Sequence, residues 1–136
     1  ETYVMTELQT WDKNEDERIR YFSGTATYTN TFKLKKQPDQ PVWIDLGRVM
    51  VMARVYVNNQ YAGGVWTSPY RLNIQHLLHK GTNTLRVEVV NNWQNRLIGD
   101  QKLPENERPT WTSVNPWRAD SPLQESGLVG PVRLLQ

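Results

Sequence analysis

Residues 85–100 read L-R-V-E-V-V-N-N-W-Q-N-R-L-I-G-D, and their pattern changes halfway along. In the first half, Leu85, Val87 and Val89 alternate with Arg86 and Glu88. Alternation with a period of two is typical of a β-strand that has one buried face. The second half carries polar side chains that can bind a ligand. A core strand that leads into such a loop is a common way to hold a functional site on a rigid scaffold.

The segment that follows, residues 91–126, shows no clear periodicity. A connection of that length without regular structure is uncommon inside a compact domain, and it is usually functional or disordered. Trp93, Trp111 and Trp117 lie within it, and this aromatic content argues against disorder. We therefore predict a long ordered loop over residues 91–126.

The remaining chain predicts more strands of the same kind. Residues 25–34 and 49–57 alternate, Asn58-Asn59 suits a two-residue hairpin turn, and residues 75–80 suit one short helical turn. About seven or eight short strands without a long amphipathic helix predict two packed antiparallel sheets in one domain over residues 1–136. The residues predicted to form its core are Val49, Val51, Val55, Val57, Leu85, Val87, Val89 and Val132.

Length and charge exclude several classes of protein. The 136 residues suit a single domain, and the formal net charge is only +2. The basic residues are scattered, so we expect neither nucleic acid nor a membrane as a partner. The chain has no cysteine, which excludes a disulfide framework and thiolate metal sites. No apolar run approaches the ~20 residues of a membrane span, and no signal peptide is visible.

One short acidic stretch resembles a metal loop. Asp12, Asn14 and Asp16 have the spacing that begins a calcium-binding loop. Glu17 stands where such a loop needs glycine, and Ser23 stands where it needs glutamate. We therefore predict a solvated turn here. No motif supports a structural calcium, and we expect no cofactor and no metal site.

Catalytic groups are equally sparse. His76 and His79 lie three residues apart without an acid at ligand spacing, so they are predicted to be surface residues. Glycoside hydrolysis needs two carboxyl groups ~5 Å or ~6.5–9.5 Å apart. The loop offers five candidates, so such a pair stays open at this point: Asp100, Glu105, Glu107, Asp120 and Glu125.

Aromatic composition favours a sugar-binding surface. The chain has six Trp and six Tyr but only two Phe. Tryptophan and tyrosine present an apolar face that suits the C–H side of a sugar ring, and planar polar groups suit its hydroxyls. The residues predicted to bind carbohydrate are Trp66, Tyr70, Asn91, Trp93, Asn95, Arg96, Asp100, Trp111 and Trp117. The alternative is that Trp66 and Tyr70 pack on the edge of the sandwich and that Arg96 pairs with a loop carboxylate.

Four segments together resemble a known family. They read W-I-D-L-G-R-V (43–49), A-R-V-Y-V-N-N (53–59), G-G-V-W-T-S-P-Y-R-L-N-I (63–74) and K-G-T-N-T-L-R-V-E-V-V-N-N-W-x-N-R-L-I (80–98). This set resembles the sugar-binding jelly-roll domain of glycoside hydrolase family 2, within the galactose-binding-like folds. The N-R-L-I-G-D loop is most similar to the C-terminal module of family 106 α-L-rhamnosidases. The resemblance covers about residues 20–135.

The resemblance implies an all-β jelly-roll β-sandwich excised from a larger modular enzyme. It implies a non-catalytic carbohydrate-binding or substrate-shaping module, whose partners are a carbohydrate and the catalytic domain that holds the catalytic acids. It also implies a periplasmic or secreted location. Two alternatives stay open, a purely structural module that docks through its tryptophans and an independent lectin-like binder.

The resemblance also gives Asp100 an expected role. In family 2 enzymes, a comparable loop carries an acid followed by glutamine to the active site of the barrel. Asp100-Gln101 stands in a similar place, after a core strand and before a long excursion. A carboxylate can accept charge-assisted hydrogen bonds from two sugar hydroxyls. The alternative is an internal pair between Arg96 and Asp100 that only holds the loop in shape.

Overall fold

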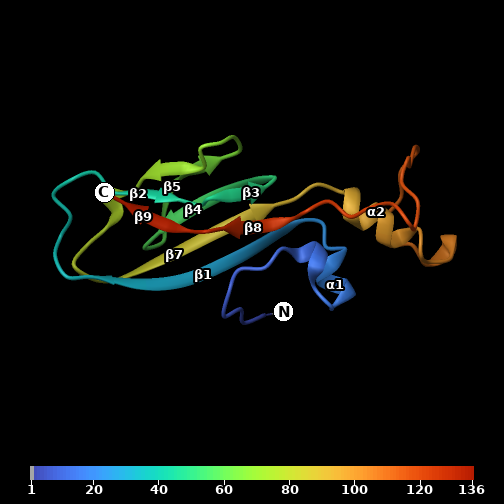
Figure 1. The fold of residues 1–136 in the computed structure, drawn as a ribbon, viewed down its shortest axis with the longest axis horizontal. Coiled ribbons are helices and arrows are strands. Elements are labelled where there is room, and N and C mark those ends of the chain that lie inside the picture. Colours follow the sequence, from blue (N-terminus) through green and yellow to red (C-terminus); the bar gives the residue numbers. More distant parts are fainter. Residues whose placement is uncertain (1) are drawn as a thin grey trace.

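The computed structural model of the chain describes residues 2–136. Most of its regular structure is β-strand, and the two α-helices lie at the end of the molecule opposite the C-terminus (Figure 1). The strands are β1 (Thr25–Leu34), β2 (Trp43–Asp45), β3 (Arg48–Met50), β4 (Met52–Val57), β5 (Gln60–Val65), β6 (Arg71–Asn73), β7 (Gly81–Val90), β8 (Gly127–Gly130) and β9 (Arg133–Leu135). The helices are η1 (Trp11–Lys13), α1 (Glu17–Arg20), η2 (Gln75–Leu77), α2 (Gln94–Asp100) and η3 (Glu105–Glu107).

The strands form three antiparallel groups. One sheet has the order β1-β7-β4-β5, a second has the order β6-β2-β9, and β3 pairs with β8. The register places Val55 opposite Val87 and Val57 opposite Leu85, so apolar side chains line up across the strands. This arrangement confirms the predicted all-β fold of antiparallel sheets.

The predicted alternation places most of the core correctly. Val49, Val55, Val57, Val87 and Val89 are all buried, with at most 1% of their surface exposed. Two further predicted residues, Leu85 and Val132, are half-buried and pack against this core. Burying a side chain of this size stabilises the fold by about 1.5–3 kcal/mol, so these valines are a main source of stability.

Val51 is the exception, because 43% of it is exposed. The sequence predicts one strand over residues 49–57, but the structure has two segments that meet at this residue. β3 ends at Met50 and pairs with β8, whereas β4 begins at Met52 and pairs with β7. Because the two segments have different partners, the alternation is interrupted and Val51 faces outward. Its predicted place in the core was wrong.

The predicted hairpin turn between β4 and β5 is confirmed. Asn58 and Asn59 have φ angles of 50° and 64°, the left-handed conformation that asparagine tolerates. The Asn58 side chain also ties the turn to β7, since its Oδ1 accepts a hydrogen bond from the Thr84 amide at 2.9 Å. Its Nδ2 donates to the Leu77 carbonyl at 2.9 Å and to Asn83 Oδ1 at 2.8 Å.

The predicted long loop contains regular structure at its start. Residues 94–100 form α2, so the expectation of a loop over the whole of residues 91–126 was wrong there. The helix buries Asn95 and Asp100 together with Ile98 and Gly99, and no side chain caps its N-terminus. Its buried face is half polar, so neither hydrophobic periodicity nor a capping residue marks it in the sequence. Among residues 2–136, no helix is long and apolar enough to cross a membrane.

Candidate functional site

Seven of the nine predicted site residues lie at one end of the sandwich. We call this region, formed by α1 and residues 91–126 with α2, the loop end (Figure 1). Its predicted site residues are Asn91, Trp93, Asn95, Arg96, Asp100, Trp111 and Trp117. Trp66 and Tyr70 lie apart from them, on the connection between β5 and β6.

Asp100 is the centre of the polar contacts at the loop end. Only 2% of it is exposed, and Arg96 Nε donates a hydrogen bond of 2.6 Å to its Oδ1. The Thr110 amide donates to Oδ2 at 3.2 Å, and the Thr110 hydroxyl donates to the same oxygen. Both carboxylate oxygens therefore bind donors from this chain. The internal Arg96–Asp100 pair, the alternative considered for this residue, is the arrangement in the structure.

Asn91 and Asn95 also turn inward. Asn91 Nδ2 donates to the Phe22 carbonyl at 2.6 Å, and its Oδ1 accepts from the Gly24 amide at 3.0 Å. Asn95 makes a reciprocal pair with the backbone of Gln124, donating at 2.6 Å and accepting at 2.8 Å. These bonds join α2 and the end of β7 to the start of β1 and to the returning chain. A role of either asparagine in sugar binding stays a prediction.

The tryptophans at the loop end face the solvent to different degrees. Trp111 is 87% exposed and Trp93 is 59% exposed, whereas Trp117 is half-buried. Near Trp111, the Thr112 hydroxyl donates to the Val114 carbonyl at 3.0 Å. The preceding Thr110 is bonded through its amide and its hydroxyl to the buried Asp100, so the backbone beside Trp111 is anchored to α2. An exposed indole on an ordered support is a surface on which a sugar ring can stack.

The two predicted residues outside the loop end behave differently from each other. Tyr70 is half-buried and packs against the core, which is the alternative considered for it. Trp66 is 67% exposed. Neither residue lies in the chain segment that forms the loop end, so the structure does not bring all nine predicted residues into one site.

A groove of about 160 Å³ separates α1 from α2. Lys102 Nζ donates to the Tyr21 hydroxyl at 2.6 Å, and the guanidinium of Arg96 lies 5.9 Å from the Tyr21 ring centre. Gly99 permits this contact, since a Cβ there would lie 2.6 Å from Tyr21 Cγ. The groove is smaller than the ~300–1,000 Å³ of typical ligand pockets. We therefore regard this groove as part of the contact between the two helices and not as a ligand site.

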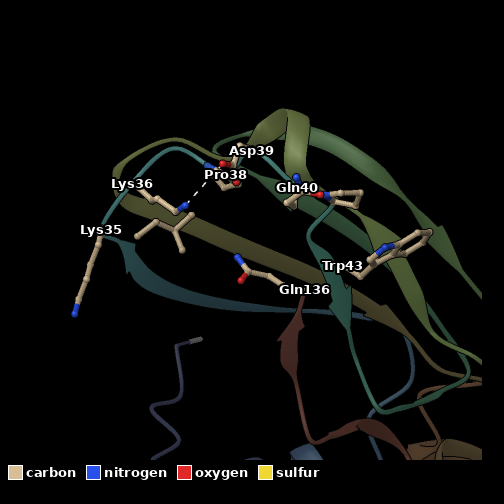
Figure 2. A pocket seen from close by; sticks show the side chains of 9 residues that line it. Lys35, Lys36, Pro38, Asp39, Gln40, Trp43 and Gln136 are labelled. Atoms are coloured by element: carbon tan, nitrogen blue, oxygen red, sulfur yellow. Dashed lines mark ion pairs between the residues drawn. The ribbon is translucent and has the colours of Figure 1, made fainter.

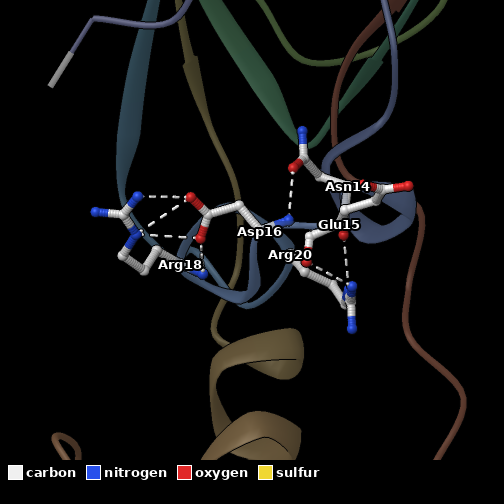
Figure 3. A network of polar contacts seen from close by, with 5 residues as sticks. All are labelled: Asn14, Glu15, Asp16, Arg18 and Arg20. Atoms are coloured by element: carbon white, nitrogen blue, oxygen red, sulfur yellow. Dashed lines mark hydrogen bonds and ion pairs between the residues drawn. The ribbon is translucent and has the colours of Figure 1, made fainter.

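The acidic stretch from η1 to the start of α1 forms a turn in which Lys13 and Glu15 are exposed, as predicted, although Asn14 is buried. Asn14 is buried and its Oδ1 accepts from the Asp16 amide at 2.9 Å (Figure 3). Asp16 caps α1 by accepting from the Arg18 amide, and its carboxylate also binds the Arg18 guanidinium. The guanidinium bond, followed by the amide bond, lowers the pKa of the Asp16 carboxyl. Arg20 Nε donates to the Asn14 carbonyl at 2.7 Å. Within residues 2–136, no three histidine or acidic side chains group closely enough to hold a metal ion.

The sequence analysis missed Trp43, which lines a cleft of about 590 Å³ at the other end of the sandwich. Trp43 begins β2, where Val42, Ile44 and Leu46 are buried and the residue between the first two faces outward. An outward tryptophan beside the turn-forming Pro41 was the available signal.

Three comparisons place this geometry among known proteins. A rhamnosidase from Novosphingobium sp. PP1Y is 46% identical and superposes with a TM-score of 0.88, over 96% of this chain and 12% of that one. A Formosa agariphila protein named "Putative beta-glucuronidase" is 36% identical over 94% of this chain and 13% of its own length. The β-D-glucuronidase of Dictyoglomus thermophilum, at 19% identity and a TM-score of 0.59 over 69% of this chain and 18% of that one, shares the fold alone.

The chain thus spans only 12–13% of the length of the Novosphingobium rhamnosidase and of the Formosa protein. Residues 4–123 match the model of one family, described as glycosyl hydrolase 2 galactose-binding domain-like. That match covers well over half of the 136 residues, and it agrees with the antiparallel sandwich and with the motifs at residues 43–98. The chain therefore belongs to the glycosyl hydrolase 2 galactose-binding domain-like family.

Proposed function

We propose that the chain is a non-catalytic accessory module of a glycoside hydrolase, and that its loop end contacts the carbohydrate substrate of a catalytic domain in the same polypeptide. The observation that carries this proposal is Trp111, which is 87% exposed while the neighbouring Thr110 is bonded to the buried Asp100. The names of the two more similar relatives and the small share of their length that the chain covers support an accessory role.

The contacts of two of the five candidate carboxylates support the non-catalytic part. Asp100 is buried with both oxygens bonded, and Glu125 forms an ion pair with Arg48. A general acid needs access to the glycosidic oxygen, and a nucleophile needs access to the anomeric carbon. Asp100 has neither in this structure. We also propose that the protein acts in the periplasm or outside the cell, which fractionation of the producing cells would test.

Trp111→Ala in the full natural protein tests the loop-end contact. Loss of one stacking face is expected to lower kcat/KM for an oligosaccharide substrate by about tenfold, or ~1.4 kcal/mol, without a change in Tm. Tyr61→Ala is the matched control, because Tyr61 is also aromatic and 58% exposed but lies on β5. Unchanged kinetics for Trp111→Ala would contradict the proposal.

One observation favours a second candidate, a module that docks onto a neighbouring domain. Val114 is 76% exposed three residues after Trp111, and this pair has the apolar character of a docking surface. Docking predicts that Trp111→Ala lowers the Tm of the full protein and speeds proteolysis between the module and the rest. A substrate contact predicts a change in KM without either effect.

A further inference from the structure

A cleft lies at the end of the sandwich away from the loop end. It is formed by the connection from β1 to β2 and by the last residue, Gln136, which follows β9 (Figure 2). Its volume of about 590 Å³ falls within the ~300–1,000 Å³ range of ligand pockets. None of the nine residues predicted from the sequence to bind carbohydrate lines it.

The cleft combines an aromatic wall with polar side chains. Trp43 lies on one side and is 43% exposed, and Lys36 and Asp39 lie on the other (Figure 2). Gln40 and Gln136 lie between these two sides. Lys36 Nζ is 3.8 Å from Asp39 Oδ2, so these two charges compensate each other. Lys35 also lines the cleft, but its side chain points away from Gln136 (Figure 2). This surface suits an uncharged ligand that has both an apolar face and many hydroxyl groups.

Hydrogen bonds fix the connection that forms the cleft. Gln37 Nε2 donates to the Leu78 carbonyl at 2.8 Å, and Gln75 Nε2 donates to the Pro38 carbonyl at 3.4 Å. The Ile74 amide donates to the Val42 carbonyl at 2.8 Å. Pro38 itself has a restricted φ angle. A connection held in this way is preorganised, which lowers the entropy cost of binding.

We propose that this cleft is a carbohydrate-binding site for uncharged pyranose units of a polysaccharide, separate from the loop end. Trp43 stacks on the C–H face of a sugar ring, and Lys36, Asp39 and Gln40 bind its hydroxyls. The side chain of Lys35 points away from Gln136, so the cleft lacks the converging positive charges that a phosphate ligand would need (Figure 2). This proposal rests on the proposed function in one respect only, namely that the protein acts on carbohydrate.

The position of the cleft predicts which substrates depend on it. β1 runs from the loop end towards the cleft and has ten residues, which span ~33 Å at ~3.3 Å each. A small aryl glycoside bound near the loop end cannot reach that far. Only a long polymer can contact both ends, so the cleft should affect polymer binding without affecting the turnover of small substrates.

Affinity electrophoresis of the full natural protein tests the site. The probes are two uncharged polysaccharides, galactomannan and xyloglucan, cast separately into native gels. We expect at least one polymer to retard the wild type and Trp43→Ala to weaken its retardation at least tenfold, while Trp43→Phe keeps part of it. Tyr61→Ala is the matched control, since it removes an exposed aromatic side chain from β5, outside the cleft. Gln40→Ala, in the exposed connection, gives a second reading if Trp43→Ala does not fold.

Two outcomes would overturn the site. One is retardation of Trp43→Ala and Gln40→Ala equal to that of the wild type, and the other is a wild type that neither polymer retards. The oligosaccharide kinetics of Trp111→Ala separate this failure from that of the proposed function. If Trp111→Ala still lowers kcat/KM for the oligosaccharide, the loop-end contact stands and only the cleft is refuted.

Discussion

The four-stranded sheet and the loop end are both ordered, but different forces order them. In the sheet, the buried side chains are apolar, as at Val55 and Val87. At the loop end, buried positions include Asn91, Asn95 and Asp100, each bonded to a distant part of the chain. Apolar packing tolerates many substitutions of similar volume, whereas a buried polar group becomes costly as soon as one partner is lost. The sheet is therefore a tolerant scaffold, and the loop end depends on a few exact contacts.

The energies point the same way. A hydrogen bond makes a net contribution of only about 0.5–1.5 kcal/mol to stability, but a buried donor or acceptor left without its partner costs about 1–3 kcal/mol. The removal of one charge from a buried ion pair costs about 3–5 kcal/mol. The largest single effect should therefore come from the loop end, although the sheet buries more apolar surface.

Asp100→Ala should have that largest effect. It removes the acceptor of Arg96 and of two Thr110 donors, and we expect the local free energy of opening over residues 94–126 to fall by about 3 kcal/mol. This is the low end of the range, because the Arg96 side chain is 22% exposed and can reach water. Hydrogen exchange of the backbone amides measures the change.

Two comparisons sharpen this prediction. Glu105→Ala, in the exposed η3 helix, should leave exchange unchanged. If the amides of β4 and β7 lost protection as strongly as residues 94–126, the two regions would unfold together and the contrast between them would fail. A variant that kept its protection but lost substrate affinity in the full protein would instead place Asp100 in the substrate contact.

Val87→Ala should have the next largest effect, now on the whole sandwich. It removes buried methyl groups and leaves a cavity, so we expect the free energy of unfolding to fall by about 1–3 kcal/mol. Val51→Ala is the matched control, because Val51 is 43% exposed and should cost less than about 0.5 kcal/mol. Urea unfolding followed by circular dichroism measures both. Equal losses of unfolding free energy for the two valines would show that Val51 contributes to the core as Val87 does.

The sequence predicts the sheet well because a strand's alternation is a local property. Val87 and Val89 show their burial in the order of the residues alone. The error at Val51 arises where the pairing partner changes from β8 to β7, and a change of partner leaves no mark on the local pattern. Burial there depends on residues distant in the sequence.

The sequence predicts which polar side chains lie in the loop-end segment, but not how they are oriented, and their role in sugar binding stays a prediction. The sequence places Asn95 and Asp100 in the right segment, but their partners Gln124 and Thr110 lie 29 and 10 residues further along. Side chains that can bind a ligand can equally satisfy the backbone of their own chain. Only the fold shows which partner they have, and it also shows that Trp43 borders a cleft.

The smallest predicted effect concerns Asp45, which has an arginine partner as Asp100 does but lies in the sandwich. Its Oδ1 accepts from the Gly47 amide at 2.8 Å, and Arg71 Nε donates to its Oδ2 at 2.9 Å. The Gly47 bond, followed by Arg71 and the charge of Arg133, lowers the pKa of the Asp45 carboxyl. A group whose pKa is lower in the folded state stabilises the fold above its unfolded pKa of about 3.9. That contribution is lost as the pH falls through the folded pKa.

Asp45→Asn isolates this contribution, because asparagine keeps the acceptor for Gly47 but has no charge. The Arg71 side chain is 47% exposed and the Asp45 side chain is 16% exposed, so solvent screens the pair. At pH 7 we expect the variant to lose less than about 1 kcal/mol. Below pH ~4 that difference should shrink, because protonation removes the charge of the wild-type carboxyl and leaves it neutral, like asparagine. Urea unfolding of both proteins at pH 7 and pH 3 measures it, and the other carboxylates cancel because both proteins contain them. A difference that is the same at both pH values would show that the charge of Asp45 is irrelevant to stability. A loss as large as that of Asp100→Ala would show that burial does not set the cost of an arginine–aspartate pair in this fold.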